Sequence, residues 1–266
     1  MTNHQTANIH IGIIGGLGKM GRWFHRFFSE LGYPVSVADR STRQTPELLA
    51  QTCQVVLVAV PLQETVQVVR TVGPLVQKGA LLMDIASLKR EVVAAMLKFC
   101  SGAVIGTHPL FGPGEPNITG QTVVLCPGRG RGWQDWVTGI FVEGGARVEV
   151  VSPEEHDYHM ALVQGLTHFC TLALGLTIDS LNFDPEKLGR FATPTFHRRL
   201  MQISHVFSQD ADLYGAMPML NSAFGEVFQE FEKVFFLLKE VIDKKDIEEF
   251  ASLFDKARAR FCSSSR

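Results

Sequence analysis

The fold is decided by residues 9–21, IHIGIIGGLGKMG, in which an apolar run, Ile9–Ile14, leads directly into a glycine-rich turn. Gly16, Gly18 and Gly21 have the spacing G-x-G-x-x-G, and a helical pattern continues from the turn to Leu31. A pyrophosphate fits such a turn because the first glycine permits the tight bend, the second lets the phosphates approach the backbone, and the third lets the helix pack on the strand. Strand, turn and helix in this order predict a dinucleotide-binding βαβ unit.

The residue that follows the second predicted strand bears on the choice of cofactor. Asp39 lies 23 residues after Gly16, where a carboxylate accepts hydrogen bonds from the adenosine ribose and repels a 2′-phosphate. Arg40 and Arg43 follow at once and could attract that phosphate, so NAD is favoured and NADP stays open. The third strand, Gln54–Val60, ends at Pro61. The predicted cofactor-binding residues are Gly16, Leu17, Gly18, Lys19, Met20, Gly21, Asp39, Arg40, Val60 and Pro61.

Strand-like and helix-like segments alternate as far as Val151, and the pattern then changes. Alternation of this kind predicts a mainly parallel sheet with helical crossovers. From the capping sequence Ser152-Pro153-Glu154-Glu155 onward we expect helices alone, over about 158–180, 195–207, 212–242 and 245–261. The predicted fold is an α/β N-terminal Rossmann-type dinucleotide-binding domain, residues 1–151, followed by an all-α helical C-terminal domain, residues 152–266, that binds substrate and dimerises.

Composition excludes several classes of protein. The 266 residues carry a net charge of −2, which gives no reason to expect nucleic acid binding. The five cysteines include no C-x-x-C pair, so no metal site is predicted. Continuous apolar runs such as Val55–Leu62 fall short of the roughly 18–20 residues that span a bilayer, and the start, Met1–Asn8, is polar. We therefore expect a soluble cytoplasmic protein without a membrane partner.

Polar residues gather where neighbouring strands end. The fourth strand runs into Asp84 and then Ser87 and Lys89, and the fifth runs into Thr107-His108-Pro109. Ligands of open parallel sheets lie beyond the carboxyl ends of the strands. A histidine at such an end is well placed to face a nicotinamide.

These motifs together resemble the prephenate/arogenate dehydrogenase family of tyrosine biosynthesis. The resemblance rests on the glycine motif, on D-x-x-S-x-K from Asp84, on G-x-H-P-x-F-G-P from Gly106, and on E-H-D-x-x-M-A-x-x-Q-x-x-x-H-F from Glu155. It runs from Ile9 to about Phe261 and looks closest to the dehydrogenase part of bifunctional chorismate mutase–prephenate dehydrogenases. With no mutase segment before Ile9, it implies a monofunctional enzyme.

The resemblance implies oxidative decarboxylation of prephenate to 4-hydroxyphenylpyruvate with NAD. It implies that His108 accepts the hydroxyl proton and that Ser87 binds near the same hydroxyl, as the two catalytic residues. Lys89 would offer charge to a carboxylate or brace its loop, and His156 would contact substrate or make a structural hydrogen bond. The substrate-binding residues so implied are Lys89, His156, His168, His197 and His205.

The chain departs from the family pattern at three positions. His197 and His205 stand where relatives carry arginines, and Thr167 stands where they often carry another. A histidine is a weaker, pH-dependent substitute for a bidentate guanidinium. The neighbouring Arg198 and Arg199 do not replace it automatically, because a shift of one or two helical residues turns a side chain by about 100–200°.

Three other functions remain open at this point. Arogenate dehydrogenase would run the same chemistry on an amino acid side chain, although the sequence offers no added acid for its ammonium group. A 3-hydroxyacid dehydrogenase or an imine reductase shares the domain plan, but usually with a lysine acid/base, and none is obvious in Tyr158–Ser180. A non-catalytic NAD-binding module would not need both His108 and Ser87.

The apolar helices after Tyr158 predict a homodimer formed through the helical domain.

Overall fold

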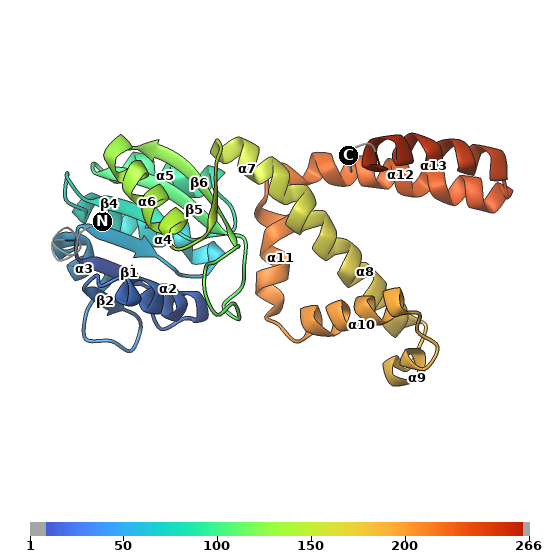
Figure 1. Ribbon diagram of the computed structural model, residues 1–266, viewed down its shortest axis with the longest axis horizontal. Helices are drawn as coiled ribbons and strands as arrows, with labels where there is room; N and C mark the ends of the chain where they lie inside the picture. Colours follow the sequence, from blue (N-terminus) through green and yellow to red (C-terminus); the bar gives the residue numbers. More distant parts are fainter. Residues whose placement is uncertain (1–8, 263–266) are drawn as a thin grey trace. The chain divides into compact units, whose positions relative to one another are not determined.

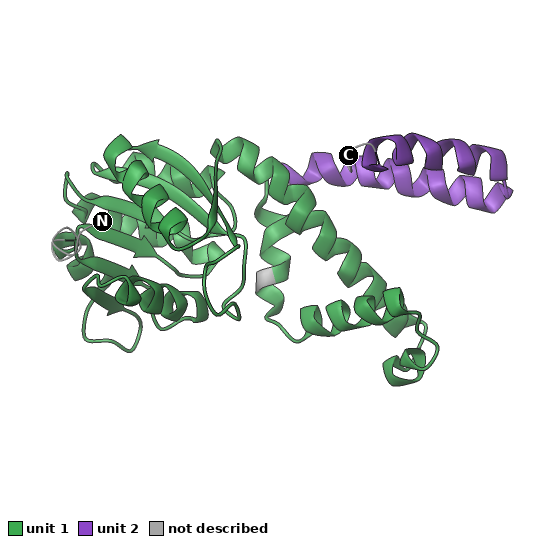
Figure 2. Cartoon of the chain, in the orientation of Figure 1, with its two compact units in different colours: residues 1–222 green, residues 223–266 purple. Residues whose placement is uncertain are grey.

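The computed structural model describes residues 9–262, which form two compact units, residues 1–222 and residues 223–266 (Figure 2). The polar start Met1–Asn8 lies outside the described residues. The first unit holds the sheet and the helices up to Ser222. It therefore extends beyond the predicted domain boundary at Val151, because the helices that follow Ser152 pack on the sheet domain.

A seven-stranded sheet forms the centre of the first unit, in the order β2-β1-β3-β4-β5-β6-β7 (Figure 1). It is parallel from β2 to β5, β6 runs antiparallel to β5, and β7 runs parallel to β6. The predicted mainly parallel sheet is confirmed. The strands are β1 Ile11–Ile14, β2 Val35–Ala38, β3 Val55–Val58, β4 Leu81–Asp84, β5 Ala103–Pro109, β6 Thr122–Arg129 and β7 Arg147–Val150.

Helices cover both faces of this sheet (Figure 1). On one face, α2 (Lys19–Glu30) and α6 (Arg131–Glu143) cover Ile11, Ile13 and their neighbours. On the other, α3 (Pro46–Thr52), α4 (Leu62–Val72) and α5 (Arg90–Phe99) cover the alternate residues, with a short 3₁₀ turn, η1 (Gly73–Leu75), after α4. Burial on both faces explains why these strands are continuous apolar runs. Sequence reasoning missed α3, which Thr45 caps at Leu48 N.

The helical region begins where the sequence places it. Ser152 caps α7 (Pro153–Met160), and the run continues through a π-helical turn, η2 (Ala161–Leu166), into α8 (Thr167–Ser180). Helices α9 (Pro185–Gly189), α10 (Pro194–Phe207) and α11 (Ala211–Leu220) follow. Helix α7 packs on α5 and β6, and α11 packs on η2 and α4. The π-helical turn is thereby held close to the sheet domain.

The second unit consists of α12 (Phe224–Lys244) and α13 (Ile247–Cys262), packed against each other (Figure 1). The prediction of one helix over 212–242 was wrong, because the chain breaks between α11 and α12. Asn221 ends α11 in an extended conformation, and its buried amide donates to the Asp157 carbonyl over 2.8 Å. This contact fixes the end of α11 against α7.

The continuous run Pro153–Ser180 is long and apolar enough to cross a membrane by length and composition, and 22% of its most apolar window is buried. It differs from the unbroken apolar runs considered above because small and polar residues are spread through it. Leu162, Val163 and Leu176 are among its exposed side chains.

Candidate functional site

His108 occupies the end of β5 and is 3% exposed. It lies within the strand rather than just past it. Its Nδ1 lies 2.9 Å from Nε2 of His156, and Nδ1 of His156 lies 2.7 Å from Oδ1 of Asp157. Helix α7 thus places the histidine of E-H-D against the histidine of H-P-x-F-G-P, with the aspartate on the far side of that first histidine.

The Asp157 carboxylate fixes the protons in this chain of contacts. It accepts the backbone N–H groups of Lys89 over 2.7 Å and Arg90 over 2.9 Å, at the start of α5. Because an ionised carboxylate only accepts, Nδ1 of His156 must donate to it and Nε2 of His156 must accept. Nδ1 of His108 then donates, and its Nε2 carries the acceptor lone pair.

His108 is neutral at physiological pH. Burial lowers its pKa well below the usual value of 6.5, and the neighbouring His156 and Lys89 lower the pKa further. A neutral imidazole with an unprotonated Nε2 can accept a proton from a hydroxyl group. The arrangement is that of a general base.

Lys89 lies beneath this site rather than in it. Its fully buried ammonium donates to a carboxylate oxygen of Asp84 and to the carbonyl of Thr107, the latter over 2.7 Å. Burial raises the pKa of the Asp84 carboxyl, and the Lys89 ammonium opposes that rise. These contacts tie the end of β4 to the end of β5. The geometry therefore favours a bracing role for Lys89 over contact with a substrate carboxylate.

The other predicted substrate residues are less closely connected. His156 uses both ring nitrogens on His108 and Asp157, which favours its structural role. His168 lies partly buried on α8, with its ring edge-on to Tyr214 at 4.8 Å between centroids, and burial lowers its pKa. His197 and His205 are exposed on α10, and no contact joins them to His108 within the described residues. Ser87 lies partly exposed between β4 and α5.

The glycine-rich turn has the form that a dinucleotide requires. Gly15 has φ +81°, and a Cβ on it would lie 2.6 Å from the Ala59 carbonyl oxygen. A Cβ on Gly21 would lie 2.3 Å from the Gly15 oxygen, so α2 approaches the turn closely. Gly18 is the N-cap of α2 and has no side chain to bind its first N–H groups. These donors and the helix dipole suit a pyrophosphate.

Asp39 holds this turn from the end of β2. Its carboxylate accepts the N–H of Leu17 over 3.0 Å and the N–H of Arg40 over 2.7 Å. The guanidinium of Arg40 pairs with Glu64 over 2.9 Å on the surface. Arg40 therefore has an exposed carboxylate partner that competes with a 2′-phosphate.

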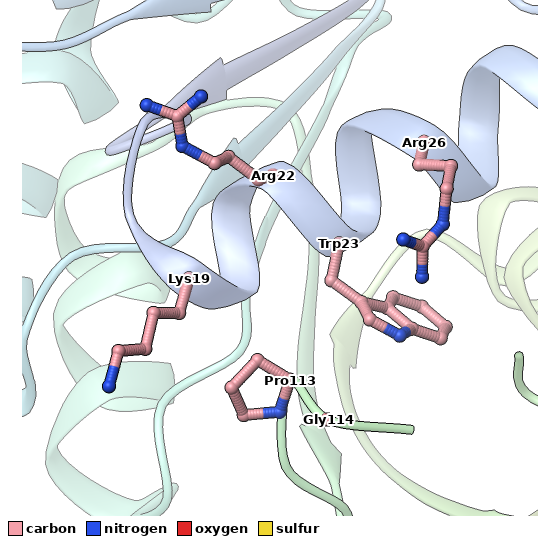
Figure 3. Close-up of a pocket in the computed structure, with 6 residues that line it drawn as sticks. All are labelled: Lys19, Arg22, Trp23, Arg26, Pro113 and Gly114. Carbon is pink, nitrogen blue, oxygen red and sulfur yellow. The ribbon is translucent and has the colours of Figure 1, made fainter. Parts of the chain in front are cut away.

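A cavity of about 370 Å³ opens beside the turn (Figure 3). Three cations of α2 line it with Trp23, whose indole donates to the Glu115 carbonyl over 2.7 Å. Figure 3 shows Pro113 facing this side of α2. The cationic lining suits an anionic ligand group. The lining residues are Lys19, Arg22, Trp23, Arg26, Pro113 and Gly114.

Sequence reasoning missed two residues of the site, Asp157 and Gln164. The Gln164 amide nitrogen lies 3.4 Å from Nε2 of His108, and its amide oxygen is buried with no hydrogen-bond partner among the described residues. Both residues stand in the quoted E-H-D motif. Gln164 follows His156 by eight residues, a spacing that places side chains on similar faces of a helix, and this signal could have identified it.

Comparison with known proteins adds the family. Residues 31–150 match the family described as "Prephenate dehydrogenase, nucleotide-binding domain", and residues 152–256 match "Prephenate dehydrogenase, dimerization domain". The "Probable arogenate/prephenate dehydrogenase" of Methanocaldococcus jannaschii is 32% identical over 281 residues, which cover 98% of this chain and 63% of that protein. The "T-protein" of Haemophilus influenzae is 32% identical over 256 residues, covering 96% of this chain and 68% of its own length.

The fold has solved counterparts. The crystal structure of prephenate dehydrogenase from A. aeolicus, in complex with hydroxyphenyl propionate and NAD+, superposes with a TM-score of 0.78 and 19% identity. The match covers 97% of this chain and 99% of that one. This chain therefore shares their domain plan, and it spans 63% and 68% of the length of the two curated relatives above.

Proposed function

This chain belongs to the prephenate dehydrogenase family, and on that premise we propose that it oxidises and decarboxylates prephenate to 4-hydroxyphenylpyruvate with NAD. The observation that carries the proposal is His108, a buried neutral imidazole whose Nε2 is left unprotonated, as an acceptor, by the contacts to His156 and Asp157. Ser87 follows β4, the strand that pairs in parallel with the strand of His108, and is proposed to bind near the same hydroxyl.

The reaction needs one proton acceptor and one hydride acceptor. Prephenate carries a hydroxyl on a ring carbon that also bears hydrogen, and a carboxylate on the opposite ring carbon. NAD held at the glycine-rich turn would supply the acceptor for the hydride of the carbinol carbon. His108 accepts the hydroxyl proton, and the electrons of the departing CO₂ make the ring aromatic. The ring oxygen recovers its proton from His108, so the enzyme returns to its starting state.

The residues around the glycine-rich turn fit the cofactor. The uncapped start of α2 would bind the pyrophosphate, and Lys19 would add positive charge beside it. Asp39 would accept hydrogen bonds from the ribose while it keeps its hydrogen bond from the Leu17 N–H in the turn. We assign the cationic cavity between α2 and Pro113 to the outer edge of this site. Met20, Val60 and Pro61 complete the proposed cofactor contacts.

The substrate carboxylates need cations or hydrogen-bond donors. His168, partly buried on α8, is proposed to supply one contact. His197 and His205 on the exposed side of α10 remain candidates for the others. Lys89 is proposed as a brace, since its ammonium is already engaged by Asp84 and Thr107.

Arogenate is the second candidate substrate, because a relative of this chain bears a name that includes both activities. The two substrates differ only in the side chain, and the base at His108 serves both. The experiment is to mix the protein with NAD+ and either prephenate or arogenate and to follow NADH at 340 nm. Faster turnover of prephenate supports the proposal, whereas turnover of arogenate alone reassigns the substrate.

His108→Asn tests the observation on which the proposal rests. A positioned base contributes roughly 10²–10⁴-fold, so turnover should fall by that range while NAD+ binding persists. The matched control is His159→Asn, an exposed histidine on the same helix as His156, and it should leave turnover unchanged. Turnover of His108→Asn within threefold of wild type would remove His108 from this role.

We also propose a cytoplasmic homodimer formed through the helical domain. Leu162, Val163 and Leu176 leave an apolar surface on the run Pro153–Ser180, and a second copy would cover it. A lipid environment suits this run poorly, because it also carries the His156, Asp157 and Gln164 side chains that meet the sheet domain. A single 29.5 kDa species in sedimentation at micromolar protein would contradict the dimer.

A further inference from the structure

The π-helical turn η2 presents Gln164 to His108, and this side chain is given no role in the chemistry above. A π-helical turn is rare and is frequently found at functional sites, because its extra residue redirects the side chains that it carries. Here it follows α7 directly, so the helix that supplies His156 and Asp157 also supplies Gln164.

The contact between Gln164 and His108 is loose. The Gln164 amide nitrogen lies 3.4 Å from Nε2 of His108, beyond the usual 2.7–3.2 Å of an N–H···O bond. The amide oxygen of Gln164 is buried and unpartnered among the described residues. Buried polar groups in native proteins are nearly always hydrogen-bonded, and an exception calls for an explanation. The loose contact leaves the N–H of Gln164 able to bind a closer acceptor beside His108.

We propose that Gln164 is a further catalytic residue that binds the reacting hydroxyl oxygen beside His108. This inference rests on the proposed function. A hydroxyl oxygen that lies beside the line between these two nitrogens, within hydrogen-bond distance of both, can donate its proton to Nε2 of His108 and accept an N–H of Gln164. The two side chains then hold the hydroxyl in one orientation, with its proton directed at the base.

The contact is strongest where the reaction needs it. As His108 takes the proton, the hydroxyl oxygen gains negative charge, which departure of the hydride relieves by forming a carbonyl. The oxygen gains negative charge again when loss of CO₂ makes the ring aromatic, until His108 returns the proton. An N–H donor already aimed at this oxygen stabilises the charge with no reorganisation, because the turn and the surrounding helices hold the amide in place. The donor therefore lowers the barrier more than it strengthens substrate binding.

The test compares Gln164→Leu, which keeps the approximate size of the side chain and removes both polar groups, with wild type. We expect kcat to fall roughly tenfold or more, with a smaller change in KM and an unchanged dissociation constant for NAD+. The matched control is Gln67→Leu on the exposed face of α4, which should leave all three quantities unchanged.

A second variant keeps the inference falsifiable if the leucine disturbs packing. Gln164→Glu keeps an acceptor oxygen and removes the N–H. Its negative charge would lie near His108, where the other titratable groups are His156, Lys89 and Asp157. We expect a similar loss of kcat and an acid limb of kcat/KM moved to higher pH, because a nearby anion favours protonated His108. The moved limb shows that the side chain at position 164 faces His108, and the loss of kcat tests the N–H donor itself.

The outcomes separate this inference from the proposed function. Wild type that oxidises neither prephenate nor arogenate overturns both. Active wild type with both Gln164 variants within threefold in kcat, and an unmoved acid limb, overturns the role of Gln164 alone. Active wild type with impaired kcat in Gln164→Leu and Gln164→Glu, and with normal Gln67→Leu, supports it.

Discussion

The carboxylate of Asp157 accepts a hydrogen bond from Nδ1 of His156 over 2.7 Å. This contact between sequence neighbours determines the chemistry of a third residue, because it forces His156 to present an acceptor to His108. Asp157 has a second role at the same time, since it binds the N–H groups of Lys89 and Arg90 at the start of α5. One buried carboxylate thus joins the helical region to the sheet and sets the tautomer of the proposed base.

Asp157→Asn should damage both activity and stability. One carbonyl oxygen would remain for three donors, and the new NH₂ group would face N–H groups. We expect kcat to fall at least about tenfold, because His108 no longer holds its proton on Nδ1 alone, and the free energy of unfolding to fall by about 1–3 kcal/mol. Turnover at saturating prephenate and urea unfolding measure the two effects.

Glu155→Gln is the matched control for that substitution. Glu155 lies on the same helix, is exposed, and keeps its backbone contact to the Ser152 hydroxyl in the variant. It should behave as wild type in both measurements. If Asp157→Asn loses stability and keeps full turnover, the carboxylate is a structural cap and does not govern the tautomer.

Lys89→Met should lower the free energy of unfolding and leave the affinity for substrate almost unchanged. The substitution leaves the buried Asp84 carboxylate without its ammonium, and breaking a buried pair costs about 3–5 kcal/mol. We expect KM for prephenate to stay within about twofold of wild type at a temperature where the variant is folded. A large rise in KM with little loss of stability would return Lys89 to the role of a carboxylate ligand.

Much of the fold could be predicted from the sequence because local rules and the fold agree there. The G-x-G-x-x-G turn, the doubly buried strands and the Ser152 cap each depend on a few neighbouring residues, and each is confirmed. The break at Asn221 could not be predicted in the same way. It depends on a hydrogen bond to the Asp157 carbonyl, 64 residues away in the chain.

The site residues also divide into those predictable from local sequence and those that depend on distant contacts. A histidine at the end of β5 is a local feature, and its position could be predicted from periodicity. The contacts to His108 from His156 and Gln164 cross 48 and 56 residues, and only packing of α7 and η2 on the sheet domain creates them. Lys89 shows the opposite case, since a cation expected at the active site proved to be engaged by Asp84 and the Thr107 carbonyl beneath that site.

Glu64→Gln should relax the preference for NAD. In the folded protein Glu64 pairs with Arg40 over 2.9 Å, and Arg40 follows the residue proposed to bind the ribose. Removal of the carboxylate charge frees the guanidinium for a 2′-phosphate, an anion that arginine binds well. We expect kcat/KM for NADP to rise severalfold while kcat/KM for NAD changes little. No change for NADP would show that Asp39 alone sets the preference.

The acid limb of activity should lie below pH 6.5. His108 must be neutral to accept a proton, and burial lowers its pKa well below 6.5, so kcat/KM should fall only as the pH drops through that lowered value. A profile of kcat/KM between pH 5 and 8 measures the limb. A limb centred above pH 7 would mean that the group seen is not the buried His108.

The free energy of unfolding should also depend on pH through the buried His108, and the direction of that dependence can be predicted. Below pH 6.5 an unfolded chain protonates this residue while the folded chain keeps it neutral, so the unfolded state binds more protons and stability falls as the pH falls from about 6.5 toward the folded pKa. The slope from one such group is at most about 1.4 kcal/mol per pH unit. His168, with a pKa also lowered by burial, contributes in the same direction, and Asp84, with a raised pKa, contributes in the opposite one.

Urea unfolding of wild type and His108→Asn at pH 7.5 and 5.5 isolates His108, because the other two groups are common to both proteins. We expect the variant to lose less stability than wild type between the two pH values; an equal loss would show that His108 takes up its proton as readily in the folded protein as in the unfolded chain.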